Sequence, residues 1–409
     1  MPIRLTPQEK QIAKRLAEIK NISGSHSPSP AMLTNAGVTV KYDFCYLSNP
    51  YATDLFIKYF RKDFKNNSAL HALVEYYPSQ NRTLAEKLAD SPLVKWNSRR
   101  LGVPPSSAGR VVQPPKAPPF IKGDNIFVGN GATEIIQATL QNFSRKKIMV
   151  PVPTFSPYLE FAPKGVSVAM HQLRAEKEFR LETERFLADV RKEKPDTVVI
   201  INPNNPDGSF VNANDLHLLL KQLRGVETVI VDESFSHFVG KKVESAANLV
   251  ERYPNLVVVK SLSKDFGIAG LRLGYGVMSE KRVSVLLERG YLWNISGFGE
   301  YFLNLLNREE FLTAYERARL RAVGERDEFF TELSKIKEIK VYPSKANMFL
   351  IELLGGTKAS DLMVALLSRY GIFVRTCYDK VGLTGEFIRV ASRRKEENTR
   401  AANALKAAL

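Results

Sequence analysis

Short apolar runs rich in valine and isoleucine recur along the middle of this chain, and helical stretches separate them. The runs are Ile126–Val128, Lys147–Val150, Thr197–Ile201, Thr228–Val231 and Leu256–Val259. Alternation of such runs with helices is typical of a mostly parallel sheet that helices cover on both faces. The sequence therefore predicts an α/β fold built around one central sheet.

Each run is followed by small, polar or glycine residues. These tails are Gly129–Gly131, Pro153–Thr154, Asn202–Pro206, Asp232–Glu233 and Ser261. Ligands of open α/β sheets bind at the carboxyl ends of the strands. We therefore expect the five tails to meet in one crevice.

The chain is long enough for a large domain and a smaller one, since it has 409 residues of which 44% are hydrophobic. We expect residues 1–68 to form an amino-terminal arm and part of the small domain, and residues 69–298 to form the large domain. Residues 299–409 would complete a smaller α+β domain. A basic, proline-rich insertion spans residues 91–124, where a surface excursion is favoured over a polyproline segment that binds a partner.

The net charge of +16 would attract nucleic acid if it were concentrated. The basic residues are instead interleaved with acidic ones, so we expect no nucleic-acid partner and an anionic cofactor or substrate. No apolar run approaches the roughly 18 residues of a membrane span. Two cysteines make no disulfide framework, and no His or Cys spacing resembles a metal site. A cytoplasmic protein with no membrane partner and no metal is expected.

The segment Ser261–Gly274 carries the most specific chemical signal. It places Lys264 beside Ser261 and Ser263 and, eight residues later, Arg272. A lysine in such a frame can bond an aldehyde while the hydroxyls and the guanidinium hold a phosphate. This is the chemistry of enzymes that use pyridoxal 5'-phosphate.

Three further requirements of that cofactor have candidates at the strand ends. Asp232 would face the pyridine nitrogen, because a protonated ring is the electron sink; an aspartate that only caps a turn is the alternative. Residues 129–134 lead into a helix whose first amides would cradle the phosphate, and the third glycine of a dinucleotide fingerprint is missing there. Asn205 would donate to the ring hydroxyl and Tyr158 would stack on the ring face.

Taken together, these motifs resemble the class I and II aminotransferases of fold type I, and most closely their histidinol-phosphate aminotransferase-like branch. The likeness runs from about Leu47 to the carboxyl end and includes Tyr77-Pro78 and Phe387–Val390. It implies that Lys264 carries the Schiff base and that Asp232 pairs with the pyridine nitrogen. It further implies a homodimer with a shared site, in which Tyr77 reaches in from the neighbouring subunit and the phosphate is bound by Ala132, Thr133, Ser261, Ser263 and Arg272.

The resemblance also suggests contacts with an amino acid or amine substrate. Arg389 matches the arginine that grips an α-carboxylate, which planar guanidinium geometry explains. Arg375 matches an arginine that helps to hold a distal phosphate, and pairing with a carboxylate of the chain is an equal alternative. Further pocket candidates are Asn49, Tyr51 and Asn294.

Two positions depart from the family pattern. Phe235 stands where most members have a tyrosine, so the ring oxygen would lack a phenol donor. Related decarboxylases of threonine phosphate share such a phenylalanine. Asp207 replaces the usual threonine of the Asn-Pro turn. For the nearby His237, a packed or capping role is favoured over a proton relay.

The favoured expectation is a transferase that carries out ping-pong transamination of an amino acid or related amine through Lys264. A decarboxylase, or a β- or γ-replacement enzyme with the same cofactor, is the nearest alternative, because Phe235 leaves open which bond at the substrate carbon is broken. A non-catalytic binding module of the same fold is a further alternative. The incomplete glycine fingerprint disfavours a nicotinamide oxidoreductase.

Overall fold

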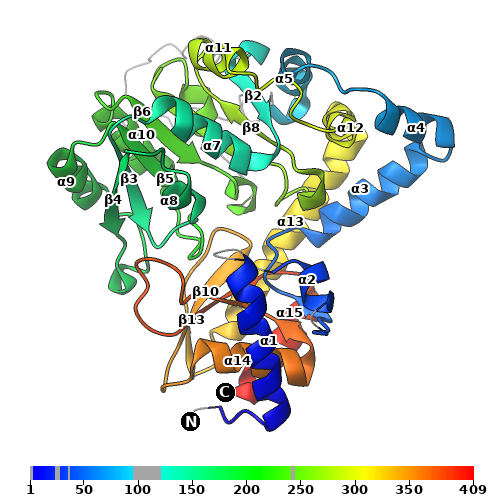
Figure 1. Cartoon of the computed structure of the whole chain (residues 1–409), viewed down its shortest axis with the longest axis vertical. Helices are drawn as coiled ribbons and strands as arrows, with labels where there is room; N and C mark the ends of the chain where they lie inside the picture. Colours follow the sequence, from blue (N-terminus) through cyan, green and yellow to red (C-terminus); the bar gives the residue numbers. More distant parts are fainter. Residues whose placement is uncertain (1–2, 24–27, 36, 95–120, 241–244) are drawn as a thin grey trace, which may run out of the picture.

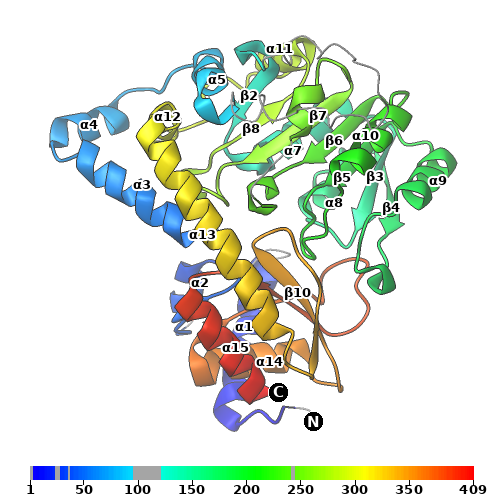
Figure 2. The same ribbon diagram turned by 180° about the vertical axis from the view of Figure 1, so that it is seen from behind.

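The computed structural model describes residues 3–23, 28–35, 37–94, 121–240 and 245–409, so most of the proline-rich insertion lies outside the described residues. Two units are visible in Figure 1, one around a seven-stranded sheet and one around a four-stranded sheet. We call them the large unit and the small unit. Helix α13 (Glu309–Leu333) runs from one unit into the other, as Figure 2 shows from behind.

The large sheet confirms the predicted α/β fold. Its strands are β2 (Ile126–Gly129), β3 (Lys147–Val152), β4 (Ser167–Gln172), β5 (Thr197–Ile201), β6 (Thr228–Asp232), β7 (Leu256–Ser261) and β8 (Gly274–Val277). They lie in the order β2-β8-β7-β6-β5-β3-β4. Neighbours are parallel except at β8, which is antiparallel to both β2 and β7.

Apolar side chains of the central strands fill both faces of this sheet. Val198 and Ile200 of β5 belong to the cluster on one face, and Val199 and Ile201 belong to the cluster on the other. Successive side chains of a strand point to opposite faces, which explains why the buried runs are apolar at every position. The flanking helices are α5 (Asn81–Asp90), α7 (Gly131–Phe143), α8 (Pro157–Glu160), α9 (Thr183–Glu193), α10 (Ala213–Gln222), α11 (Glu280–Glu288) and α12 (Gly297–Leu305).

Two strands of the large sheet carry no long apolar run in the sequence. Strand β4 lies at the edge and is largely exposed, so polar residues are tolerated in it. Strand β8 contains two glycines, which weaken a strand pattern. A Cβ at Gly274 would lie 2.7 Å from the amide nitrogen of Ala132 and from the carbonyl oxygen of Lys260. Glycine there lets the start of α7 approach the sheet closely.

The small unit combines both ends of the chain. Its four-stranded sheet has the order β12-β13-β10-β9, and β1 (Tyr42–Asp43) pairs in parallel with β11 (Ile372–Phe373). Leu16 and Ile19 of α1 pack in one apolar cluster with Val364 and Leu367 of α14. Both termini therefore lie at the same end of the molecule (Figure 1). The strands are β9 (Ile339–Val341), β10 (Met348–Leu353), β12 (Arg375–Thr376) and β13 (Phe387–Ala391), and the helices are α1 (Pro7–Ser23), α2 (Pro30–Asn35), α14 (Ala359–Tyr370) and α15 (Lys395–Ala408).

Two helices link the units on the side of α13. They are α3 (Pro50–Asp63) and α4 (Asn67–Glu75). Five single turns of 3-10 helix complete the described part: η1 (Gly123–Asn125), η2 (Ala175–Lys177), η3 (Ser236–Phe238), η4 (Ala246–Leu249) and η5 (Ala269–Leu271). None of the helices within the described ranges is long and apolar enough to cross a membrane.

Candidate active site

A cavity of about 270 Å³ lies between the large and the small unit. The large unit contributes residues that follow its strands, and the small unit contributes residues of β12, β13 and the loop between them. Eight of the predicted residues in the large unit line the cavity: Ala132, Thr133, Asn205, Asp232, Ser261, Ser263, Lys264 and Arg272. Arg375 and Arg389 of the small unit line it as well.

Lys264 lies in the loop that follows β7. Its carbonyl oxygen accepts hydrogen bonds from the backbone N–H of Asn49 at 2.8 Å and of Gly267 at 3.3 Å. Burial lowers the pKa of its ammonium to about 8, and the guanidinium groups of Arg389 and Arg272 act in the same direction. A neutral amine is the nucleophilic form of lysine. The site therefore favours bond formation between Lys264 and an aldehyde.

Asp232 ends β6 and is almost fully buried. Its carboxylate accepts hydrogen bonds from the Tyr158 hydroxyl at 2.8 Å and from the Ser234 amide at 2.9 Å. Burial raises the pKa of Asp232, and these hydrogen bonds oppose that rise because they stabilise the charged form. The carboxylate is thus fixed in orientation at the cavity wall.

Tyr158 lies elsewhere than a stacking role requires. It is fully buried and is not among the residues that line the cavity. A buried phenol needs a hydrogen-bond partner, and Asp232 is that partner. Phe155, from the same turn, lines the cavity instead. Tyr158 is therefore not placed to stack on a ring in the cavity, and Phe155 is the aromatic residue of this turn that lies at the cavity wall.

The amino-terminal end of α7 lies beside the guanidinium of Arg272. The N-cap residue Asn130 makes no side-chain hydrogen bond to the helix, so the first-turn amides of the helix remain for a ligand. Gly131 has a φ of +78°, and a Cβ there would lie 2.7 Å from Nη2 of Arg272. Glycine thus admits the guanidinium beside the helix start. This arrangement fits the phosphate of the predicted cofactor.

Arg389 on β13 connects the two units across the cavity. Its Nη1 donates to Oδ1 of Asn205 at 2.9 Å, and its Nη2 donates to the carbonyl oxygen of Cys45 at 2.9 Å. Its Nε is buried and has no hydrogen-bond partner among the described residues. The guanidinium therefore retains donor capacity for a ligand.

Arg375 lies directly opposite Arg389 in the pairing of β12 with β13. Like charges in opposed positions repel, so this pair needs a compensating anion. Asp379 supplies one charge, since its Oδ2 accepts from Nη2 of Arg375 at 2.6 Å. Arg375 thus pairs with a carboxylate of the chain and also lines the cavity, and its contact with a distal phosphate stays a prediction.

A fifth cationic residue of the cavity wall, Lys380, was not predicted. It is 8% exposed, in the loop between β12 and β13. A single lysine in a loop carries no motif, so the sequence offered no signal for it. Its position depends on how the loop folds back over the large unit.

Three predicted substrate contacts are not brought to the cavity. Oδ1 of Asn49 caps α3 by accepting from the amides of Tyr51 at 3.1 Å and Ala52 at 3.4 Å. The hydroxyl of Tyr51 donates to Glu325 at 2.6 Å. Asn294 donates to Glu134 at 2.6 Å. None of the three lines the cavity, and their role in binding substrate stays a prediction.

Tyr77 also lies away from the cavity of its own chain. Its side chain is 90% exposed, just after α4. The contact of Tyr77 with a neighbouring subunit stays a prediction.

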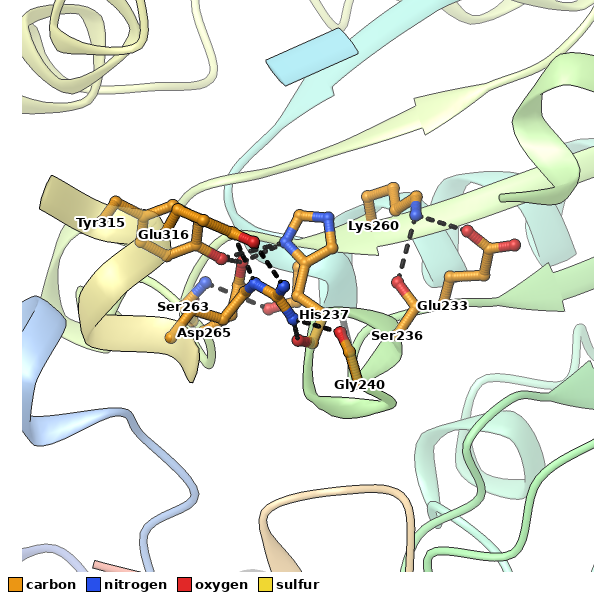
Figure 3. A network of polar contacts seen from close by, with 11 residues as sticks. Glu233, Ser236, His237, Gly240, Lys260, Ser263, Asp265, Tyr315 and Glu316 are labelled. Atoms are coloured by element: carbon orange, nitrogen blue, oxygen red, sulfur yellow. Dashed lines mark hydrogen bonds and ion pairs between the residues drawn. The ribbon is translucent and has the colours of Figure 1, made fainter. Parts of the chain in front are cut away.

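A buried polar network fixes the loop after Lys264 (Figure 3). Oδ2 of Asp265 accepts from the Tyr315 hydroxyl at 2.6 Å and lies 2.5 Å from Nδ1 of His237. Arg319 donates to the carbonyl oxygen of His237 at 2.6 Å. His237 is therefore held within the network and does not line the cavity. The network joins the Lys264 loop to α13.

A second buried pair steadies the end of β6. Glu233 forms an ion pair with Lys260 of β7, and Lys260 also donates to Ser236 at 3.2 Å (Figure 3). The Glu233 carboxylate accepts from the Ser245 hydroxyl at 2.7 Å and from the Ala246 amide at 2.6 Å. A buried pair with its remaining lone pairs satisfied orients the backbone next to Asp232.

The two residues that depart from the family pattern, Asp207 and Phe235, lie in different places. Asp207 is fully buried in the turn after β5, where it accepts from the Asn204 amide group at 2.5 Å and from the Ser209 amide at 2.8 Å; burial raises its pKa to about 6. Phe235 lines the cavity and packs against Leu47 and Met348. An apolar ring thus occupies the position of the usual phenol.

The family model described as aminotransferase class I and II matches residues 114–405. The chain belongs to this family. A histidinol-phosphate aminotransferase of Caldanaerobacter subterraneus is 34% identical over 289 residues, which cover 69% of this chain and 77% of that protein. These matches confirm the predicted resemblance and fold type I. They also confirm pyridoxal 5'-phosphate as the cofactor.

Other relatives align over nearly the whole chain. The L-serine phosphate decarboxylase of Campylobacter jejuni is 43% identical over 404 residues, or 97% of each chain. That of Sulfurospirillum multivorans is 41% identical over 411 residues, covering 99% of this chain and 98% of that protein. The solved structure of a decarboxylase from Sulfurospirillum multivorans has a TM-score of 0.87 and 41% identity, and the match covers 98% of this chain and 97% of that one.

Proposed function

We propose that this protein is a pyridoxal-phosphate-dependent decarboxylase that converts L-serine phosphate into ethanolamine phosphate and carbon dioxide. The observation that carries the proposal is full-length identity of 43% and 41% to two proteins named L-serine phosphate decarboxylase. The relatives thus favour the decarboxylase alternative over the transamination that the motifs had favoured.

The charges of the cavity suit a phosphorylated amino acid. Arg375, Lys380 and Arg389 bring three positive charges and Asp379 brings one negative charge, which leaves an excess of two. A phosphate monoester carries about −1.5 to −2 charges at neutral pH. The α-carboxylate of the substrate would offset one of these charges at Arg389, and a phosphate would offset the remainder, which an amino acid with a neutral side chain would leave uncompensated.

The residues on the other side of the cavity fit the cofactor. Lys264 would bond its aldehyde, the start of α7 with Arg272 would hold its phosphate, and Phe155 would lie against its ring. The amide oxygen of Asn205 faces Arg389, so the amide nitrogen remains to donate to the ring oxygen. When bound, pyridoxal phosphate supplies a protonated ring that accepts the electron pair released at the substrate carbon.

The reaction breaks the bond between the α-carbon and the carboxylate. Carbon dioxide leaves without the bonding electron pair, and a proton takes its place on the α-carbon. Asp232, oriented by Tyr158 and Ser234, would keep the ring nitrogen protonated throughout. Nζ of Lys264 would carry the proton to the α-carbon, since a pKa near 8 lets it both hold and release a proton at neutral pH.

Product analysis of the holoenzyme tests this proposal. With L-serine phosphate we expect equal amounts of carbon dioxide and ethanolamine phosphate, with the yellow form of the enzyme preserved over many turnovers. Transamination would instead yield a keto acid and a lasting absorbance near about 330 nm. Formation of a keto acid without carbon dioxide would refute the proposed decarboxylation and would show that the enzyme is a transaminase.

We further propose a homodimer in which Tyr77 contributes to the partner's site. A single chain exposes several large apolar side chains around α4 and just before α12, including Val74, Tyr76, Tyr77 and Trp293. Helices α4 and α12 are in contact, which brings the segments that carry these side chains near one another. Light scattering should give twice the chain mass, and Tyr77→Phe should weaken cofactor binding. A monomer with full activity contradicts this.

A further inference from the structure

Lys380 is held over the cavity by a loop that crosses from the small unit to the large one. The loop joins β12 to β13, and in Figure 1 it reaches toward the end of the large sheet that holds β3 and β4. Gln172 of β4 donates to the carbonyl oxygen of Gly382 at 2.8 Å, and Leu383 packs against an apolar cluster that contains Phe179. Gly382 has a φ of +89°, and a Cβ there would lie 3.0 Å from the backbone of Val152. The loop is therefore anchored on the large unit.

The ammonium of Lys380 has no hydrogen-bond or ion-pair partner within the described part of the chain, although the side chain is 8% exposed. The neighbouring carboxylate, Asp379, pairs with Arg375 instead. Lysine is almost never this buried without a partner, because desolvation of an unpaired ammonium is costly. Burial lowers the pKa of Lys380 to about 8, and Arg389 and Arg375 act in the same direction. The charge of Asp379 opposes this lowering, so the fold maintains a cation without an ion-pair partner at the cavity wall.

Arg389 and Lys380 line the same cavity as the reacting lysine. The charge of Arg389 acts on the ammonium groups of both Lys264 and Lys380. A substrate joined to the cofactor at Lys264 would therefore lie in a cavity whose wall carries both Arg389 and Lys380. We propose that Lys380 binds the phosphate of the substrate and selects for amino acids with a second anionic group, an inference that rests on the proposed function and names the contact that sets its specificity.

A charge-removing variant and a charge-keeping variant test this role in the holoenzyme. Lys380→Gln should raise KM for L-serine phosphate about 10- to 100-fold, the effect of losing one charge-assisted contact, and should leave kcat within about threefold. Lys380→Arg should recover most of the affinity. Lys337→Gln, which removes an exposed lysine of the small unit, is the matched control and should behave as wild type.

A measurement of product binding tests the role of Lys380 independently of whether the enzyme is a decarboxylase. Ethanolamine phosphate and ethanolamine are titrated into each holoenzyme and followed by cofactor absorbance. Lys380→Gln should weaken binding of the phosphate-bearing amine about 10-fold or more and leave binding of ethanolamine unchanged. If wild type releases no carbon dioxide from L-serine phosphate, the proposed function fails, and this titration still decides the role of Lys380.

The result that overturns the inference is equal binding of ethanolamine phosphate to wild type and Lys380→Gln. A loss confined to kcat overturns it as well, because a binding residue must change KM. The unfolding temperature serves as a folding check: it should be unchanged or higher in Lys380→Gln, since the variant removes a buried unpaired charge. Lys380→Arg keeps the test decisive if the glutamine variant folds poorly.

Discussion

The hydroxyl of Tyr158 offers a direct test of how Asp232 is held. Tyr158→Phe removes one oxygen atom and keeps the buried ring. In the structure that oxygen donates to Oδ2 of Asp232 at 2.8 Å, and the Ser234 amide continues to serve Oδ1. The variant therefore deletes one of these two donors without opening a cavity.

The size of the effect of Tyr158→Phe can be calculated from the free energy of a hydrogen bond to a charged acceptor. Such a bond contributes about 1.5–3 kcal/mol, and one pKa unit corresponds to about 1.4 kcal/mol. The pKa of Asp232, already raised by burial, should rise by a further 1–2 units or so in the apoprotein. If the same free energy is lost in the transition state, kcat falls about 10- to 100-fold.

The assay combines turnover of L-serine phosphate with cofactor affinity from equilibrium titration of the apoprotein. Both should fall in Tyr158→Phe. Phe155→Leu is the matched comparison, because Phe155 lines the cavity and Tyr158 does not. It should lower cofactor affinity through lost contact with the ring, and the hydrogen bond to Asp232 should be unaffected.

A stacking role for Tyr158 makes the opposite prediction. Phenylalanine stacks as well as tyrosine, so Tyr158→Phe would then keep full activity and Phe155→Leu would have little effect. That pair of results would refute the assignment of Tyr158 as a positioning residue for Asp232.

Three further perturbations follow from the same geometry. The rate at which apoprotein combines with pyridoxal phosphate, followed by absorbance, should rise with pH and level off above about 8, because only neutral Lys264 forms the bond; the folded pKa lies below the ordinary value of 10.5, so apoprotein stability should also rise between these two values, and Lys264→Ala should abolish the first effect and reduce the second, to which Lys380 contributes through its own pKa of about 8. Gly131→Ala should weaken cofactor binding in equilibrium dialysis by about tenfold or more, since its φ is +78° and the new methyl group would meet Arg272; unchanged affinity contradicts the proposed phosphate site. Asp265→Ala should lower the free energy of unfolding in urea by about 2–4 kcal/mol, because the buried Tyr315 hydroxyl loses its acceptor, and a loss below about 1 kcal/mol would show that the network adds little.

The fold was largely readable from local sequence, and its exceptions have physical causes. The five predicted strands are buried on both faces, so their apolar character is continuous in the sequence. Strands β4 and β8 were missed because one is exposed at the sheet edge and the other needs glycine to admit α7. Those constraints come from neighbouring elements, which a local pattern does not contain.

The candidate site likewise contains residues that a local sequence pattern predicts and residues that only the packing of distant segments places. Lys264, Asp232 and Asn205 follow strands directly, and the carboxyl ends of parallel strands meet at one edge, so their convergence was predictable. Asn49, Tyr51 and Asn294 were assigned by analogy alone, and the structure engages each in a local contact away from the cavity.

The sequence by itself determined the α/β fold and the cofactor, because strand-end motifs and the frame around Lys264 are short-range patterns. Only the tertiary structure decided that Tyr158 holds Asp232 and that Lys380 faces the cavity. Tyr158 and Asp232 are 74 residues apart, and Lys380 reaches its position because its loop is anchored on β4 of the other unit. Such contacts depend on how distant segments pack, and the distribution of charge that they create supports the phosphorylated substrate that we propose.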